Sequence, residues 1–277
     1  MSKLRSEELA YEIRKNAIKM VNHAHASHLG GVLSCADIVA VLYSEVAHVN
    51  PENPKDPKRD RIVLSKGHNG AAIYVALAKL GFFDAELLKT YGDNGGIFSC
   101  HISHKGVPGV EFSTGSLGQG VCVACGMAVA AKRKQETHKV YTIVGDGECD
   151  EGSVWEMALL ASQQKLDNFT VIVDRNYQQA MGRIEEVINT EPFVEKWKAF
   201  GWHVVDVKDG NDHEQLRVAF AEKSDGKPKV IIARTVKGKG VSFMEDKLLW
   251  HYRDPQGVDF ENALKEVEEN YAKSCNR

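Results

Sequence analysis

Residues 143–176 read IVGDGECDEGSVWEMALLASQQKLDNFTVIVDRN, and their polar side chains are of types that bind metal ions and phosphates. A β-branched run at 140–144 ends in GDG, whose aspartate is Asp146. A second run at 169–173 ends in DRN, whose asparagine is Asn176. With a helix expected to begin near 151–153, this is a βαβ unit, in which both strands end at the same edge of a parallel sheet. We therefore expect Asp146 and Asn176 to meet there.

These two side chains offer a carboxylate and an amide oxygen. Such oxygens suit Mg²⁺, which completes its shell with water and phosphate oxygens. The helix that follows the turn has free N–H groups that could face such a phosphate. Gly145 and Gly147 let the backbone approach a ligand without a Cβ. The alternative interpretation is a surface turn whose aspartate caps a helix. The pairing of the two strand ends favours the ligand site.

Length, charge and apolar runs restrict the class of protein. The 277 residues can form one large α/β domain, and we expect a single domain over 1–277 that ends in a helical extension. The formal net charge of −3, with both signs interspersed, gives no reason to expect nucleic acid or an anionic membrane as partner. No apolar run approaches the roughly 20 residues that span a bilayer. The charged N-terminus has no signal-peptide core, so we expect a cytoplasmic protein.

Hydrophobic periodicity predicts alternating strands and helices. Strands are expected at 61–65, 140–144, 169–173, 203–207 and 230–233. Helices are expected at 5–24, 35–46 (starting at Ser34 or Asp37), after 68 through 80, 118–134, from 151–153, 191–200, 213–223 and 260–273. The pattern predicts an α/β fold with a doubly wound, mostly parallel sheet flanked by helices. Residues 91–117 are rich in Gly, His and Ser, and a loop of that length is usually functional.

The six cysteines are scattered along the chain. Cys122 and Cys125 form a CxxC in an apolar helix of small residues. A zinc or redox role is one interpretation, and small buried hydrophobic residues are the other. We expect no disulfides in a cytoplasmic chain.

Several of the eleven histidines lie where strand edges would present them: His28, His68, His101, His104 and His251. An imidazole can bind hydroxyls, carbonyls and phosphates or transfer protons, although a lone histidine is more often structural. His23, His25 and His28 could also be a metal cluster, but their spacing does not place them on one helix face.

Six distinctive motifs occur along the chain, together with a Trp-His pair at 250–251: ASHLGG (26–31), SKGH (65–68), PGVEFSTGSLGQG (108–120), GDGECDEGSVWE (145–156), VDRN (173–176) and TVKGKGVSFME (235–245). In these motifs the chain resembles the N-terminal part of transketolase, in particular the separate N-terminal subunit of split transketolases. The motifs cover nearly the whole chain in the family's order. The resemblance implies the thiamine diphosphate-binding fold, and this chain would be its diphosphate-binding module.

The resemblance also implies site residues. Asp146, Asn176 and the backbone carbonyl of Gln178 would bind Mg²⁺, or another divalent ion such as Ca²⁺ or Mn²⁺. The residues implied to contact thiamine diphosphate are His68, Gly115, Ser116, Leu117, Gly147, Asn176 and His251. His28, His101 and His251 match catalytic histidines that face the sugar. Glu151 matches a carboxylate at the subunit interface near the cofactor-activating glutamate, and Glu156 is a weaker match of the same kind.

Three positions depart from the family's pattern. The loop around His101 is one residue longer than expected, so His104 competes for the substrate-facing role. Arg175 replaces the Asp or Asn that is common between Asp174 and Asn176. After Gln178 the family commonly has an apolar-Asp-Gly step, whereas residues 180–182 read Ala-Met-Gly.

The implied function is transfer of a two-carbon ketol unit from a ketose phosphate to an aldose in carbohydrate metabolism, such as the pentose phosphate reactions. The family's activating glutamate and phosphate-binding arginines lie on a pyrimidine-binding domain, which we expect on a separate C-terminal subunit in an α2β2 heterotetramer. The helix at 121–132 could pack across that interface or simply against the sheet. Alternatives are half of another thiamine diphosphate enzyme, such as the α chain of a 2-oxo acid dehydrogenase or a deoxyxylulose phosphate synthase-like protein, or a non-catalytic paralogue.

Overall fold

The computed structural model describes residues 4–275 and contains a five-stranded parallel sheet in the order β1-β2-β3-β5-β4. The strands are β1 (Arg61–Leu64), β2 (Val140–Gly145), β3 (Phe169–Arg175), β4 (His203–Val207) and β5 (Lys229–Arg234). All five predicted strands are present, and the predicted doubly wound α/β fold is confirmed. The parallel direction places all five carboxyl ends along one edge of the sheet.

Successive residues of the inner strands point into two different cores. On β3, Ile172 belongs to one core, whereas Val171 and Val173 belong to the other. Ile143 on β2 and Ile231 on β5 join Ile172. This alternation follows from the two-residue period of a strand. Both faces must be covered, which is why the central residues of these strands are mostly apolar.

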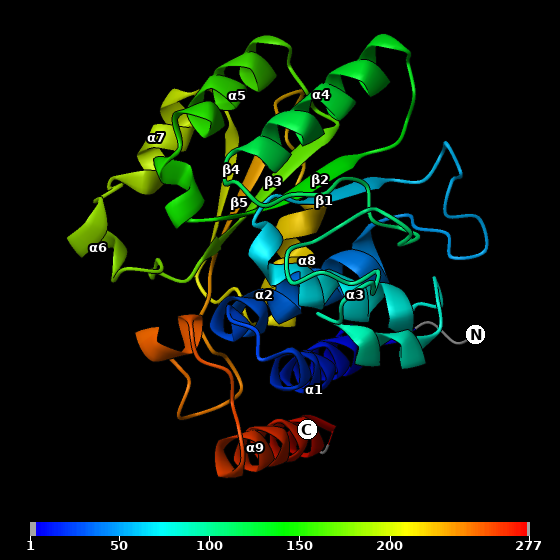
Figure 1. Ribbon diagram of the computed structural model, residues 1–277. Coiled ribbons are helices and arrows are strands. Elements are labelled where there is room, and N and C mark those ends of the chain that lie inside the picture. Colours follow the sequence, from blue (N-terminus) through cyan, green and yellow to red (C-terminus); the bar gives the residue numbers. More distant parts are fainter. Residues whose placement is uncertain (1–3, 276–277) are drawn as a thin grey trace.

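Helices cover both faces of the sheet, as Figure 1 shows. The first core contains α1 (Ser6–Ala24), α2 (Leu29–Val41), α3 (Gly70–Lys79), α8 (His213–Ala221) and α9 (Val258–Cys275). The second contains α4 (Gln119–Arg133), α5 (Gly152–Gln163) and α7 (Phe193–Ala199). The C-terminal helix α9 packs on α1, where Tyr11 and Tyr271 stack with ring centroids 4.3 Å apart.

The second helix begins at Leu29, so the predicted start at Ser34 or Asp37 is wrong. Its first turn contains Gly30 and Gly31, which disfavour helix in isolation. Both are buried, and a Cβ on Gly31 would lie 2.7 Å from Nδ2 of Asn69. Close packing between segments therefore decides this helix start. The helix continues as a π-helical turn, η1 (Leu42–Val46), within the predicted range.

Short elements account for the remaining differences. The sequence pattern did not predict α6 (Ile184–Val187) or the 3-10 helices η2 (Gly67–Asn69), η3 (Ala85–Thr90), η4 (Gly147–Asp150) and η5 (Leu248–His251). Each lacks the length over which periodicity can be recognised. Residues 91–117, all described, form the predicted loop without helix or strand.

One helical stretch, Leu29–Val46, is long and apolar enough to cross a membrane by length and composition, with a mean hydropathy of 1.6 over 18 residues. This stretch was not predicted from the sequence, because glycines and a few polar residues interrupt the apolar run. In the structure 89% of this stretch is buried, and it lies in the core beside α1 and α3.

Two helical glycines should respond in opposite ways to alanine. Gly31→Ala should lower the free energy of unfolding by about 1–3 kcal/mol, because the new methyl group overlaps the buried Asn69 side chain. In the matched control, Gly126→Ala in α4, the methyl group meets nothing within 4 Å. That change should raise the same free energy by roughly 0.5–1 kcal/mol. Urea unfolding measures both, and equal effects would contradict this account of the helix start.

Candidate active site

The ends of β2 and β3 bring Asp146 and Asn176 together. Gly145 pairs with Asp174 in the parallel register, so the two side chains follow neighbouring strands at the same level. The Oδ2 atom of Asp146 accepts a hydrogen bond of 2.6 Å from the backbone N–H of Tyr177, the residue after Asn176. The structure thus places both predicted ligands at one sheet edge, and their metal-binding role stays a prediction.

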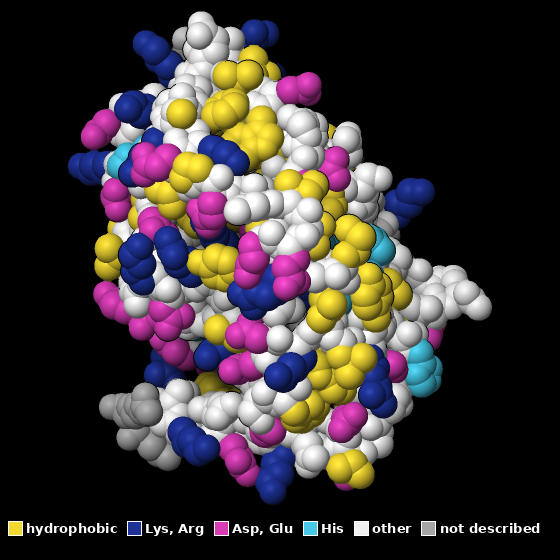
Figure 2. Space-filling model, turned by 90° about the vertical axis from the view of Figure 1, so that its left-hand side faces the viewer, with side chains coloured by type: hydrophobic (Ala, Val, Ile, Leu, Met, Phe, Trp, Pro, Cys, Tyr) yellow, Lys and Arg dark blue, Asp and Glu magenta, His cyan; other side chains and the backbone are white. Residues whose placement is uncertain are grey.

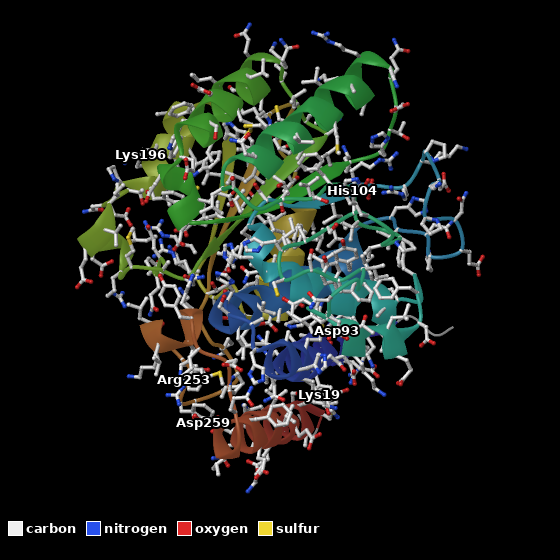
Figure 3. The ribbon with its side chains drawn as sticks, in the orientation of Figure 1. Lys19, Asp93, His104, Lys196, Arg253 and Asp259 are labelled. Atoms are coloured by element: carbon white, nitrogen blue, oxygen red, sulfur yellow. The ribbon has the colours of Figure 1, made fainter. Side chains whose placement is uncertain are left out.

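A cavity of about 390 Å³ opens at this edge, and we call it the histidine cavity. The predicted site residues that line it are His28, His68, His101, Gly115, Leu117, Asp146, Gly147, Asn176, Gln178 and His251. The other lining residues are Gly31, Lys66, Gly145, Glu148, Gln179, Ala180, Met181 and Lys237. Ser116 and Glu151 are exposed and do not line it. His104, which bonds to Ser113, does not line the cavity, whereas His101 does, so the geometry favours His101 over His104 (Figure 3).

Four imidazoles gather in this cavity around His28. Its ring centroid lies 4.9 Å from that of His251, 5.1 Å from that of His68 and 5.7 Å from that of His101. They come from four segments: the start of α2, η2, the long loop and η5. Neither His23 nor His25 lines the cavity; each pairs with a carboxylate elsewhere.

Burial and nearby positive charge keep three of these imidazoles, those of His28, His68 and His251, neutral. Burial lowers the pKa of His28 to about 4, and His101 and Lys237 add to the effect. Burial, Lys237 and His28 lower the pKa of His251 to about 3. The pKa of His68 is also well below its usual value, chiefly through burial. Near pH 7 each of these three rings therefore offers one N–H donor and one acceptor nitrogen.

A buried ion pair orients Asn176. The carboxylate of Asp174 accepts hydrogen bonds from Lys66 Nζ (2.5 Å), from Ser34 Oγ (2.6 Å) and from the Thr235 hydroxyl. The Nδ2 group of Asn176 lies 3.3 Å from Ser34 Oγ and 3.4 Å from Asp174. These contacts direct the amide nitrogen into the network. The motifs SKGH and VDRN contain this lysine and this aspartate, but their pairing was not predicted from the sequence.

Lys237 is the second buried lysine of the cavity. Its Nζ atom lies 3.2 Å from the carbonyl oxygen of Gln178, 3.3 Å from that of Gln179 and 3.1 Å from Nδ1 of His251. The motif TVKGKGVSFME contains this lysine, but its place in the cavity was not predicted from the sequence. Its signal was a lysine between apolar and glycine residues, which is unusual on a solvated surface.

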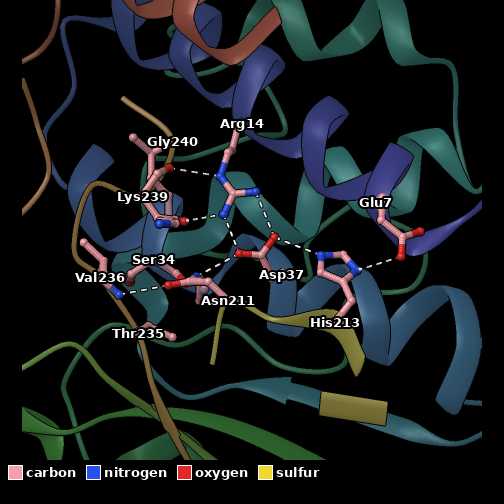
Figure 4. A network of polar contacts seen from close by, with 12 residues as sticks. Glu7, Arg14, Ser34, Asp37, Asn211, His213, Thr235, Val236, Lys239 and Gly240 are labelled. Carbon is pink, nitrogen blue, oxygen red and sulfur yellow. Dashed lines mark hydrogen bonds and ion pairs between the residues drawn. The ribbon is translucent and has the colours of Figure 1, made fainter. Parts of the chain in front are cut away.

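A polar network behind the cavity holds the Lys237 loop in place (Figure 4). Arg14 donates to the carbonyl of Lys239 at 3.0 Å and forms two bonds with Asp37, of 2.9 and 2.5 Å. His213 contacts Asp37 at 3.0 Å, and Asn211 accepts from the N–H of Val236 at 3.0 Å. A second cavity, of about 460 Å³, lies beside this network. Its charged groups are paired with one another, so we assign the active site to the histidine cavity.

The start of α5 does not face the cavity, contrary to the prediction that its N–H groups could meet a phosphate. The 3-10 helix η4 lies between β2 and α5. Ser153, near the start of α5, donates to the carbonyl of Gly118 at 3.1 Å. A Cβ on Gly118 would lie 2.3 Å from Ser153 Oγ, so α5 begins packed against α4.

The CxxC cysteines lie apart from this site. Cys125 is buried in the second core, and Cys122 donates to the carbonyl of Gly118 at 3.1 Å. All six cysteines are free. Within residues 4–275 no group of three His, Cys, Asp or Glu side chains is arranged to hold a metal ion. This geometry matches the interpretation of Cys122 and Cys125 as packed small hydrophobic residues.

The cavity fits a divalent ion and a diphosphate in its donor set. Burial and the neighbouring Asp174 raise the pKa of Asp146 to about 7, so a cation beside it would be stabilising. The Oε1 atom of Gln178 is buried without a hydrogen-bond partner in the structure. A Cβ on Gly147 would lie 2.7 Å from the Gln179 side chain, so glycine keeps this wall open. Ligands of doubly wound sheets bind at the carboxyl ends of strands, where this cavity lies. Fold and site together define a coenzyme-binding α/β domain.

Comparisons with known proteins also indicate a coenzyme-binding domain. Residues 5–253 match the family model described as transketolase, thiamine diphosphate binding domain. The chain belongs to the transketolase family, whose members are transferases. It is 42% identical over 262 residues to one of the subunits of the apulose-4-phosphate transketolase of Phocaeicola vulgatus, covering 94% of this chain and 92% of that protein. It is 40% identical to the 6-deoxy-6-sulfo-D-fructose transketolase subunit SqwG of Clostridium sp., covering 94% and 95%.

The fold is also similar to solved structures of the transketolase family. The fold is similar to that of the transketolase from Campylobacter jejuni, with a TM-score of 0.88 and 35% identity. The match covers 98% of this chain and 43% of that one. This chain therefore spans less than half the length of that transketolase.

The neutral histidines should make the folded protein sensitive to mild acid. In the unfolded chain these histidines have a pKa near 6.5, whereas in the folded protein the pKa of His28 is about 4 and that of His251 is about 3. The unfolded state therefore binds more protons, and the free energy of unfolding should fall as pH drops below 6.5. In His28→Gln or His251→Gln the fall between pH 6.5 and 5 should be shallower. Urea unfolding at several pH values measures this, with His104→Gln as the control; a slope unchanged in both variants would contradict it.

Proposed function

We propose that this chain is the thiamine diphosphate- and Mg²⁺-binding subunit of a heteromeric transketolase in the cytoplasm. The observation that carries the proposal is one cavity that joins the strand-end pair Asp146 and Asn176 to four histidines. The enzyme would transfer a two-carbon ketol unit from a ketose phosphate to an aldose. When bound, thiamine diphosphate supplies the carbanion chemistry, and the protein supplies binding, orientation and electrostatics.

The site residues fall into three groups, which would bind the metal ion, the cofactor and the sugar. Asp146, Asn176 and the carbonyl of Gln178 would hold Mg²⁺, or Ca²⁺ or Mn²⁺ in its place. The residues proposed to hold thiamine diphosphate are His68, Gly115, Ser116, Leu117 and Gly147. His28, His101 and His251 would hydrogen-bond the sugar oxygens. Proton transfer by members of this set would contribute about 10²–10⁴-fold in rate.

The partner would be a separate C-terminal subunit that carries the pyrimidine-binding domain, in an α2β2 heterotetramer. Two relatives are named as subunits, which supports a split enzyme. Met181, Leu249 and Tyr252, on or beside segments that line the cavity, are 74%, 55% and 61% exposed. Figure 2, which shows the side of the molecule that carries η5 and α6, has such hydrophobic side chains among charges of both signs. Exposed Glu151 would contact this partner.

Helix α4 fits either of the two roles considered for it. Val121, Ala124 and Ala128 are buried in the second core, so packing against the sheet accounts for one face. Gly126 and Ala130 remain exposed on this helix. That exposed face is a candidate contact with a second polypeptide.

The relatives' names narrow the choice of substrates to assay. One is named for apulose 4-phosphate and the other for 6-deoxy-6-sulfo-D-fructose. These sugars and an unbranched pentulose phosphate form the donor panel.

Transferase activity should require both polypeptides. This chain by itself, its C-terminal partner by itself and the reconstituted pair are each assayed with the donor panel, an aldose phosphate, thiamine diphosphate and Mg²⁺. We expect product only from the pair, because this chain binds the diphosphate end and the partner activates the other end. Activity of this chain without its partner would contradict the division of labour. Decarboxylation of a 2-oxo acid by the pair would assign it to another thiamine diphosphate enzyme class.

Thiamine diphosphate binding to the reconstituted pair should depend on a divalent ion and on Asp146. Calorimetry with Mg²⁺ should show binding that is at least tenfold weaker in Asp146→Asn. The control Asp150→Asn, in the same acidic turn but outside the cavity, should bind normally. Because the pKa of Asp146 is raised to about 7, protons compete with the cation, and affinity should fall as pH drops below 7. Binding without Mg²⁺ at full affinity would exclude the proposed metal site.

A further inference from the structure

Lys237 is positioned to decide which nitrogen of His251 carries a proton. Its side chain is buried, and its Nζ atom makes three contacts, to the carbonyls of Gln178 and Gln179 and to Nδ1 of His251. An ammonium group has three N–H donors and no acceptor. The three contacts therefore use all of its donors, and each partner atom must accept.

A ring nitrogen that accepts a hydrogen bond has no proton of its own. Nδ1 of neutral His251 is then unprotonated, and the ring proton lies on Nε2. A doubly protonated ring would set an N–H donor against the ammonium, at a cost in both charge and hydrogen bonding.

We propose that Lys237 is a positioning residue that locks His251 in the neutral tautomer protonated on Nε2. His251 then presents an N–H donor to the histidine cavity and cannot act there as a base. Among residues 4–275, Nε2 of His251 has no hydrogen-bond partner, so its N–H is available to a bound ligand oxygen. That the ligand is thiamine diphosphate or a sugar rests on the proposed function; the tautomer does not.

Within the part of the chain that the structure describes, the neighbouring His28 has no lysine at its Nδ1 atom, and its tautomer is not restricted in the way that Lys237 restricts His251. Its Nδ1 atom lies 2.9 Å from the hydroxyl oxygen of Ser27. A hydroxyl both donates and accepts, so this contact is compatible with either tautomer. His28 is therefore free to take the tautomer that its ligand requires, whereas His251 is restricted to one.

The tautomer can be measured directly in the full chain labelled with ¹⁵N-histidine. A ¹H–¹⁵N multiple-bond spectrum at pH 7 separates protonated from unprotonated ring nitrogens, and the signals missing in His251→Gln assign this ring. We expect an unprotonated Nδ1 and a protonated Nε2. In Lys237→Met the donor is gone, so a population protonated on Nδ1 should appear. Lys237→Arg, which keeps donor-only chemistry, should restore the wild-type pattern.

Two features keep the test decisive. Methionine matches the length of the lysine stem without a charge to bury, so Lys237→Met should fold. Lys239→Met, in the same loop, removes a partly exposed lysine that pairs with Glu245 and does not contact His251, so it should leave the His251 signals unchanged. A protonated Nδ1 in the wild-type protein overturns the proposal whether or not any variant folds. So does a Lys237→Met spectrum identical to wild type. Neither cofactor nor partner is present, so failure of the proposed function in the activity assay would not affect this result.

Discussion

The parallel pairing of β2 with β3 is the constraint on which the rest of the site depends. The register that sets Gly145 beside Asp174 places Asp146 and Asn176 at one level of the sheet edge. Because the inner strands are buried on both faces, slipping the register by one residue would exchange the residues of the two cores. Hydrophobic packing far from the cavity thus fixes the separation of the two proposed ligands.

Charge balance is the second feature that organises the cavity. Two lysines, Lys66 and Lys237, and two aspartates, Asp146 and Asp174, are buried close to one another. The two lysines have different kinds of partner. Lys66 is paired directly with Asp174 at 2.5 Å, and this contact raises the pKa of the lysine against the effect of burial. Lys237 has only carbonyls and an imidazole as partners, and its pKa is lowered by burial. The Lys66–Asp174 ion pair stabilises the fold. Lys237 instead requires the groups around it to accept hydrogen bonds.

The fold and much of the cavity could be predicted because their signals are local. Short apolar runs, separated by helical segments, predicted the five strands. The polar residues after two of these runs predicted the edge of the sheet where a ligand could bind. Three errors have physical causes. The start of α2 depends on Gly31 packing against Asn69, a segment 38 positions away in the chain. The start of α5 packs on Gly118, so its N–H groups do not face the cavity. Lys66 and Lys237 were not recognised as buried, because their neighbours in the sequence do not show which distant residues they contact.

The sequence by itself determined the chemistry that is present: a carboxylate and an amide after adjacent strands, glycines where a backbone must come close, and a set of histidines in loops. Only the tertiary structure decided which of those histidines share a cavity, which lysine contacts which ring, and that His104 and Glu151 lie outside. The reason is that residue types and periodicity are local properties of a chain. Burial, pairing and the protonation state of a ring depend on which distant segments pack against it.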